Sequence, residues 1–367
     1  MISIAHSTRS AVDDAVDEIE SAFAGIDPAL VLYFASSHYA PEVISKAVQS
    51  RFPASRTVGC STAGEIVSGM MLKNSIAAMA FDKASIGDFE IAVVQSLKSA
   101  EGVAKAFRRF EDHFGKPMLD LDPASYIGLV LVDGLSSAED RLMEAVGNQT
   151  KVLFVGGSAG DDLKFQETYV YADGVCYPHA AVLTLAKPGV RFDVLKTQSF
   201  AVLPLELTAT KVDERARTVV EFNGKPAAIA YAEAAGCRVD NLPRQFMRHP
   251  LALLIDEEPF VRSPQRVEGT SLVFYCRIKK GTTLSLLESR NIVEDTAKAI
   301  AAKRAEFGCF KGLINFNCIL RTQDLEDQDL SVAYGSIFAE IPTVGFSTYG
   351  EQYLSHVNQT ATMLVFG

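Results

Sequence analysis

The chain has 367 residues, of which 48% are hydrophobic and 22% are charged, the proportions of an ordinary globular protein. Its formal net charge of −10 argues against nucleic acid as a partner, because neutralising phosphates needs a basic surface. The longest apolar runs are far below a membrane span, and the N-terminal residues lack the pattern of a signal peptide. We therefore expect a cytoplasmic protein, and the length predicts two domains.

The first part of the chain alternates helical patterns with short apolar runs. Apolar spacing predicts helices at residues 11–23, 41–48, 100–114 and 136–146, the last opened by a capping box from Ser136 to Glu139. Pro41 suits the start of the second of these helices. The apolar runs predict strands at residues 30–35, 57–58, 75–81, 89–94, 126–132 and 151–155.

The pattern then changes to alternation and turn residues, which are typical of antiparallel strands. These strands are expected at residues 168–171, 180–185, 192–199 and 206–220. Turn residues 222–226 mark a boundary, so we predict domains at 1–220 and 221–367. The second domain has predicted helices at 226–235 and 292–307 and strands at 251–255, 271–278, 313–319 and 360–366. The predicted class is mixed α/β, with a mixed sheet flanked by helices in each domain.

The six cysteines are scattered and form no C-x-x-C pair. This spacing supports neither a zinc ribbon nor a disulfide scaffold, and it lacks the motif that attaches haem covalently. Reduced thiols are the simplest account.

One sequence motif occurs twice. Residues 59–65 (GCSTAGE) and 345–351 (GFSTYGE) share the pattern G-x-S-T-x-G-E. Residues 156–161 (GGSAGD) are a looser relative, and in all three a short apolar stretch ends in a Val-Gly step whose glycine is the first residue of the segment. Such a turn exposes several backbone N–H groups that suit an anion, although small residues also simply permit a tight turn. Near-identical copies indicate a partial internal repeat. We expect the two sister loops to converge on a common cavity.

Side chains of these signatures are candidate ligand contacts. Hydroxyls and carboxylates of both copies can hold a ligand or can cap their own turn: Ser61, Thr62, Glu65, Ser347, Thr348 and Glu351. Cys318 and Arg321 would share one rim if a strand ends near Ile319, where the guanidinium could hold a carboxylate. The alternative for this pair is a buried thiol and a surface salt bridge.

The signatures resemble those of the FIST family, whose members carry paired FIST N and FIST C domains. The likeness covers nearly the whole chain and rests on residues 58–65, 155–162, 223–227, 317–321 and 345–351. It implies a sensory protein that binds a small ligand, with amino acids the usual assignment.

The C-terminal motifs at 316–321 and 345–351 and the tail at 356–363 are similar to those of the nitric-oxide-sensing FIST haemoproteins (NosP). This resemblance implies non-covalent haem b and a partner histidine kinase or cyclic-di-GMP enzyme. It implies an iron-ligating histidine, for which we favour His356, with His249 and His38 as alternatives. Arg321 would then hold a propionate. Whether the chain acts as a monomer or a homodimer stays open.

Residues 156–160 also fit the G-x-S-x-G nucleophile elbow of serine hydrolases, with Ser158 as nucleophile. That elbow requires a helix immediately afterwards, whereas residues 168–171 are β-prone. We therefore expect a binding protein that is not an enzyme, and a serine hydrolase is the remote alternative. Nucleotide-binding and metalloprotease motifs do not occur.

Overall fold

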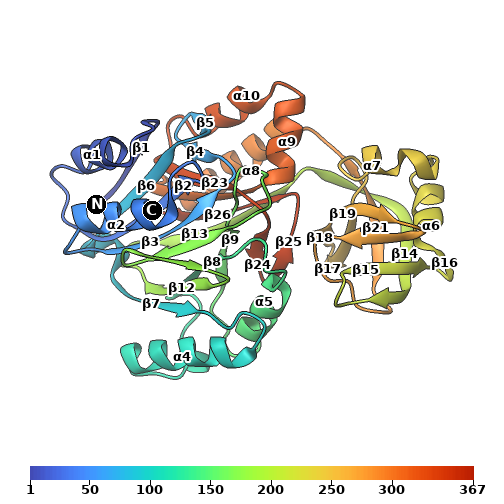
Figure 1. Ribbon diagram of the computed structural model, residues 1–367, viewed down its shortest axis with the longest axis horizontal. Coiled ribbons are helices and arrows are strands. Elements are labelled where there is room, and N and C mark those ends of the chain that lie inside the picture. The colour runs from blue at the N-terminus through green and yellow to red at the C-terminus, as the bar shows by residue number, and fades with distance from the viewer. The chain divides into compact units, whose positions relative to one another are not determined.

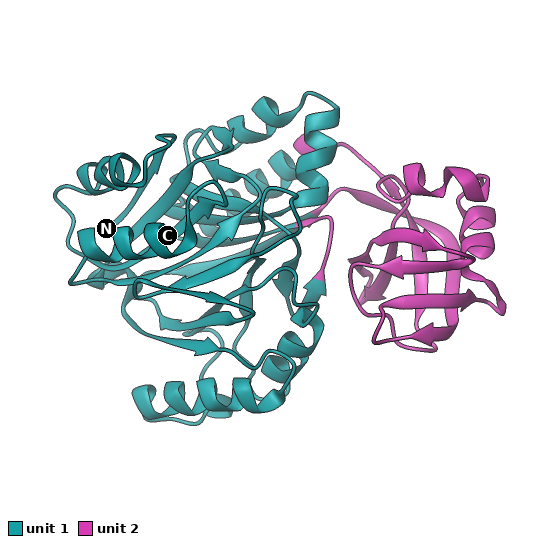
Figure 2. Cartoon of the chain, in the orientation of Figure 1, with its two compact units in different colours: residues 1–197, 296–356, 361–367 teal, residues 198–295, 357–360 magenta.

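The computed structural model describes residues 1–367 and divides into two compact units (Figure 2). Unit 1 comprises residues 1–197, 296–356 and 361–367, and unit 2 comprises residues 198–295 and 357–360. The mixed α/β class is confirmed. The boundary predicted near residue 221 lies within unit 2, because unit 2 interrupts a fold whose strands continue on both sides of it.

Unit 1 is built from three copies of one motif, each with a strand, helix, strand, helix, strand, hairpin and final strand. The first copy contains β1 (Ile2–Ser7), α1 (Val12–Ala22), β2 (Pro28–Ser36), α2 (Pro41–Arg51), β3 (Arg56–Thr62), β4 (Glu65–Val67), β5 (Met70–Leu72) and β6 (Ile76–Asp82). The short helix α3 (Lys83–Ile86) leads into the second copy.

The second copy contains β7 (Asp88–Val94), α4 (Ala100–Phe114), the 3₁₀ turn η1 (Met118–Asp120), β8 (Ile127–Val132), α5 (Glu139–Gly147), β9 (Phe154–Ser158), β10 (Tyr169–Ala172), β11 (Val175–Pro178) and β12 (Ala181–Lys187). The third contains β13 (Phe192–Gln198), α8 (Ile292–Phe307), β22 (Gly312–Cys318), α9 (Ile319–Asp327), α10 (Ser331–Ser336), β23 (Thr343–Thr348), β24 (Glu351–Tyr353), β25 (Ser355–Val357) and β26 (Thr360–Phe366). Most of unit 2 therefore lies between β13 and α8 in the sequence.

The three copies form three sheets with the same strand order. Sheet 1 begins β1-β6-β2-β3, sheet 2 begins β7-β12-β8-β9 and sheet 3 begins β13-β26-β22-β23, with the last two strands of each set parallel. Each sheet is then extended by the hairpin of another copy. Hairpin β10-β11 joins sheet 1, β24-β25 joins sheet 2 and β4-β5 joins sheet 3. This cyclic exchange places the three signatures at equivalent strand ends.

The three sheets bury a common core. Alternate residues of β2, namely Leu30, Leu32 and Phe34, join apolar residues of β8 and β22 in one cluster. The rings of Phe34, Phe316 and Phe346 meet there, with centroids 4.7–6.2 Å apart. The opposite faces of sheets 1 and 2 pack on helices α1 with α2 and α4 with α5, respectively (Figure 1). Burial on both faces explains why these strands are continuous apolar runs.

Unit 2 contains one sheet with the order β18-β17-β21-β14-β15-β20-β19, and β16 pairs with β15. Its elements are β14 (Phe200–Asp213), β15 (Thr218–Phe222), β16 (Lys225–Pro226), α6 (Ala227–Ala234), η2 (Val239–Asn241), α7 (Leu242–Gln245), β17 (Leu251–Ile255), β18 (Glu258–Arg262), β19 (Pro264–Glu268), β20 (Ser271–Phe274) and β21 (Thr283–Ser289). Apolar residues of α6 pack with those of β14, β15, β20 and β21 in its core.

The predicted capping box at Ser136 is wrong. Helix α5 begins at Glu139 after Ala138, without a side-chain cap. The Ser136 hydroxyl instead donates to the Asp133 carbonyl at 2.9 Å, which holds the turn after β8.

No helix in the chain is both long enough and apolar enough to cross a membrane.

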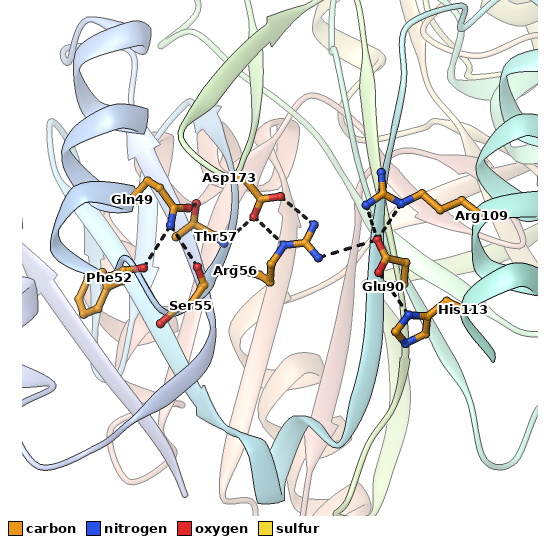
Figure 3. Close-up of polar contacts among 9 residues, drawn as sticks. All are labelled: Gln49, Phe52, Ser55, Arg56, Thr57, Glu90, Arg109, His113 and Asp173. Atoms are coloured by element: carbon orange, nitrogen blue, oxygen red, sulfur yellow. Dashed lines mark hydrogen bonds and ion pairs between the residues drawn. The ribbon is translucent and has the colours of Figure 1, made fainter.

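An ion-pair cluster joins sheets 1 and 2 (Figure 3). Arg56, at the start of β3, donates to both carboxylate oxygens of Asp173 at 2.9 and 2.7 Å. Its guanidinium also lies 3.8 Å from Glu90 of β7, which accepts from Arg109 of α4 at 2.7 Å. His113 lies 3.4 Å from the other Glu90 oxygen. Each acid is already neutralised by a neighbouring base, so this cluster serves to connect the two sheets.

Candidate functional site

The three signatures meet through backbone hydrogen bonds. The first and third are joined by Ala63 N–H to the Ser347 carbonyl at 3.3 Å and by Ser347 N–H to the Gly64 carbonyl at 2.8 Å. The second reaches the first through Gly160 N–H and the Ser61 carbonyl at 2.9 Å. Ser158 N–H donates to the Gly350 carbonyl at 2.8 Å, which joins the second to the third. The two sister loops therefore lie against each other and against the third loop, but these amides donate to neighbouring loops, and the predicted convergence on a common cavity is not seen.

The glycine of each Val-Gly step is required by a close approach between parallel strands. A Cβ atom on Gly59, Gly156 or Gly345 would lie only 2.3, 1.8 or 2.1 Å from a carbonyl oxygen of the neighbouring strand. This shared geometry accounts for the glycine in all three copies. Four signature amides, those of Ala63, Ser158, Gly160 and Ser347, already donate to carbonyls of the other loops, so the signatures act first as the junction of the three copies.

The side chains of the first signature are largely enclosed. Thr62 and Glu65 are at most 1% exposed, and the Thr62 hydroxyl donates to the Glu65 carboxyl. Glu65 also accepts from the Ser75 hydroxyl at 2.5 Å and the Ser75 amide at 3.2 Å. Burial raises the pKa of Glu65 to about 8, although the hydrogen bonds from Ser75 and Thr62 oppose that change. A neutral Glu65 can therefore persist at physiological pH.

The third signature is enclosed in the same way. Ser347, Thr348 and Glu351 are at most 1% exposed. The Ser347 hydroxyl lies 2.7 Å from that of Thr322 in α9. The Thr348 hydroxyl lies 2.9 Å from the Ser158 carbonyl, to which it donates. In this conformation these side chains stabilise the junction of the copies.

A polar pocket of about 700 Å³ opens beside this junction. It lies at the carboxyl ends of β2 and β3, against the start of α2, a position where parallel α/β sheets usually bind ligands. The loop that follows the signature of the second copy forms another wall of this pocket. We call this cavity the sheet-1 pocket, and its lining is Ser37, Tyr39, Pro41, Ser61, Asp161, Lys164, Gln166, Glu167, Tyr169 and Tyr171.

The polar groups of this pocket are already positioned by one another. Lys164 donates to the Ser37 hydroxyl at 2.9 Å, and that hydroxyl donates to Asp162 at 2.6 Å. Tyr169 donates to Glu167 at 2.5 Å, and its amide donates to the Ser61 hydroxyl at 2.9 Å. A cation and a carboxylate thus face a pocket with aromatic walls, an arrangement suited to a small ligand with charges of both signs.

Ser61 is the one predicted ligand residue that lines the sheet-1 pocket. Sequence reasoning missed Lys164, Gln166 and Glu167, which come from the segment between the second signature and β10. The sequence contained one indication of their role, because this polar segment directly follows a signature. Its contact with the end of β3 depends on the exchange of hairpin β10-β11.

Known domains match nearly the whole chain. Residues 29–225 match the FIST N domain, and residues 227–354 match the FIST C domain. The chain belongs to the FIST family. This family is linked to sensory signalling. The two matched regions of this FIST protein meet at residues 225–227, whereas its compact units divide the chain elsewhere.

A protein of Methanocaldococcus jannaschii described as uncharacterized is 23% identical over 330 residues. The aligned region covers 82% of this FIST chain and 63% of that protein. The chain thus spans less than two thirds of the relative's length.

Arg321 of this FIST protein lies inside the third copy. Strand β22 ends at Cys318 and α9 begins at Ile319. This is the strand end near Ile319 on which the predicted shared rim of Cys318 and Arg321 depended. Arg321 is 2% exposed and donates to Asn317 at 3.0 Å and to Thr296 of α8 at 2.9 Å. Cys318 is a buried thiol. Arg321 therefore connects α8, α9 and β22. The predicted alternative is confirmed for the buried thiol and wrong in placing Arg321 at the surface.

The candidate haem ligands belong to different elements of the fold. His356 is 1% exposed, its Nδ1 lies 3.3 Å from the Gln352 amide nitrogen, and its ring packs against Gly350. His249 belongs to unit 2, where its Nδ1 lies 3.1 Å from the Leu287 carbonyl oxygen. His38 is exposed in the turn after β2.

Ser158 is not presented as a nucleophile. It is fully buried, and its hydroxyl accepts from Gln352 at 3.0 Å. The chain continues from Ser158 through a loop into β10, without the helix that a nucleophile elbow needs. This geometry gives the hydrolase alternative no support.

Proposed function

We propose that this FIST protein is a sensor that binds an amino acid or a similar small carboxylate in the sheet-1 pocket and signals by altering a partner. The observation that carries this proposal is the pocket itself, which has both a lysine and acidic side chains at the ends of two parallel strands. Lys164, with Ser37, would hold the ligand carboxylate. Glu167 would face an ammonium group.

Two further features support a small polar ligand. The volume of about 700 Å³ is ample for an amino acid and falls within the usual range for ligand pockets. Tyr39, Tyr169 and Tyr171 add aromatic surface, which can pack on the apolar part of such a ligand. The sequence resemblance also predicts the partner that receives the signal, either a histidine kinase or a cyclic-di-GMP enzyme. This partner stays a prediction.

The proposal is tested by thermal unfolding with each of the twenty L-amino acids and with simple dicarboxylates. At least one compound should raise the unfolding temperature, because a ligand that binds only the folded state stabilises it. Lys164→Ala should weaken binding of that compound by roughly ten- to a hundredfold, the loss of one charge-assisted contact.

Lys105→Ala provides a matched control, because Lys105 is an exposed lysine of α4 that does not line the pocket. This variant should bind like the wild type. Equal weakening by both substitutions, or no response to any compound, would contradict the proposed site.

Haem-dependent nitric-oxide sensing stays the narrower prediction from the C-terminal motifs. The residues assigned to haem do not fit it in this conformation. His356 and Arg321 are enclosed and already hydrogen-bonded within the core, and His249 belongs to the other unit. We therefore derive no step through haem. Absorbance after reconstitution with haem tests the prediction, since a Soret band lost in His356→Ala would support it.

A further inference from the structure

We infer that Tyr349 of the third signature positions the wall of the sheet-1 pocket and couples ligand occupancy to hairpin β24-β25. This inference rests on the proposed function, because the wall concerned belongs to the proposed pocket. Tyr349 does not line the pocket. Its role would be to hold residues 161–168, which we call the wall loop.

The wall loop has a strained backbone. Asp162, Leu163 and Phe165 have φ angles of 55°, 62° and 51°, in the left-handed region that favours glycine. Each such conformation is unfavourable for a residue with a side chain and persists only where surrounding contacts impose it. The loop therefore needs specific contacts to keep this shape.

Asp162 is held by the first copy, since its amide donates to the Thr62 carbonyl at 3.2 Å and its carboxylate accepts from Ser36 and Ser37 at 3.0 and 2.6 Å. Two other side chains hold the residues that follow. The Asp161 carboxylate accepts the amides of Phe165, Gln166 and Glu167 at 2.9, 2.6 and 3.2 Å. The Tyr349 hydroxyl accepts the Leu163 amide at 2.8 Å and donates to Asp161 at 2.5 Å. One hydroxyl thus holds both the strained backbone and the carboxylate that organises the rest of the loop.

Ring packing adds to this attachment. The Phe165 ring lies over the Tyr349 ring with a centroid distance of 5.2 Å and an interplanar angle of 25°. Phe165 is 60% exposed, so most of its surface is not held by the core. The wall loop is consequently attached to the third copy mainly at Tyr349.

The same loop presents Lys164, Gln166 and Glu167 to the pocket. A ligand held by these side chains favours one conformation of the loop. Ligand binding shifts the loop toward that conformation, because a ligand shifts an equilibrium by the difference in its affinity for the two states. Tyr349 contacts the loop, so this shift changes the surroundings of Tyr349 directly.

From Tyr349 the contacts continue into hairpin β24-β25. Its amide donates to the Ser158 carbonyl at 3.2 Å, and the next residue, Gly350, accepts from Ser158 N–H. Gln352 of β24 donates to the Ser158 hydroxyl and lies 3.3 Å from His356 of β25. A change at the wall loop therefore has a short contact route to this hairpin, whose strand β25 ends at Val357, the first residue of the segment 357–360 assigned to unit 2.

Hydrogen-exchange mass spectrometry of the full chain tests the coupling. The probe is a mixture of the twenty proteinogenic L-amino acids at millimolar concentration. In the wild type the mixture should slow exchange both in residues 161–168 and in residues 350–357. Tyr349→Phe keeps the ring but removes the hydroxyl, so it should exchange several-fold faster in the wall loop without ligand. It should also lose the ligand response at 350–357.

Asp161→Asn serves as a second variant, since it weakens the same attachment from the loop side. Tyr126→Phe is the control, because the Tyr126 ring packs on Phe114 in a separate core cluster and Tyr126 does not line the pocket. It should behave as the wild type does.

Slower exchange of the wall loop with no response at 350–357 in the wild type would overturn the coupling while leaving the proposed ligand site intact. An unchanged loop exchange rate in Tyr349→Phe would overturn the positioning role. Failure of the mixture to affect either segment of the wild type would instead count against the proposed function.

Discussion

Gly156→Ala is expected to abolish folding of unit 1 or to lower its free energy of unfolding by more than about 4 kcal/mol, among the largest effects of a single substitution. The new Cβ would lie 1.8 Å from the Val130 carbonyl oxygen and 2.7 Å from the carbonyl carbon. Both atoms belong to the backbone of the adjacent parallel strand, so relief requires β8 and β9 to separate. No side-chain rotation can remove the clash.

Circular dichroism suits this measurement, because the chain contains no tryptophan to report unfolding by fluorescence. Gly147→Ala is the matched control. Gly147 ends helix α5, and a Cβ there meets nothing within 4 Å. That substitution should be neutral or stabilising by up to about 1 kcal/mol. An unfolding midpoint of Gly156→Ala equal to that of the wild type would show that the strands do not approach as described.

Glu65→Gln is expected to make the protein more stable than the wild type at alkaline pH. Burial raises the pKa of Glu65 to about 8, whereas the same carboxyl in the unfolded chain titrates near its ordinary value of 4.5. Between these two values the folded state binds the proton that the unfolded state has released. The contribution of Glu65 to stability is therefore fully present below about pH 4.5 and falls as pH rises, until it levels off above pH 8.

The loss across this range is on the order of 5 kcal/mol. The variant lacks the titration, so its advantage over the wild type should grow from pH 5 to pH 9. At pH 5 the two proteins should differ little, or the variant should be slightly less stable through imperfect hydrogen bonds to Ser75. Denaturant unfolding at several pH values measures the difference.

Glu101→Gln is the control for the loss of a carboxylate. Glu101 is exposed in the first turn of α4, so this variant should keep the pH dependence of the wild type. Parallel pH profiles for Glu65→Gln and the wild type would mean that Glu65 titrates normally and is hydrated in the folded protein.

Local patterns predicted most of the elements. The helix predicted at 100–114 coincides with α4, because apolar spacing is a local signal. The structure adds a cap by Ser99 at its start and Gly115 at its end, which are also local features. The strand predicted at 30–35 lies within β2 for a similar reason, as a strand buried on both faces is a continuous apolar run. The signatures likewise identified the family, since their residues are adjacent in the sequence.

The capping box at Ser136 failed because a serine after a strand can hold its own turn as readily as it can cap a helix. The roles of the signature side chains were also beyond local reasoning. A hydroxyl at a strand end faces either solvent or core, and Thr348 is enclosed only because Ser158, 190 residues away, lies against it.

The sequence alone therefore predicted the class, many of the elements, the family and the recurrence of a glycine-hydroxyl turn, all of which depend on neighbouring residues. It did not predict β1, β21 or α9. The tertiary structure decided that the recurrence is threefold, that hairpins pass between sheets and that the wall loop of the second copy completes a pocket in the first. These features depend on pairings between distant strands, such as β4 with β23, whose partners are selected by packing of the whole core. No local pattern encodes that selection.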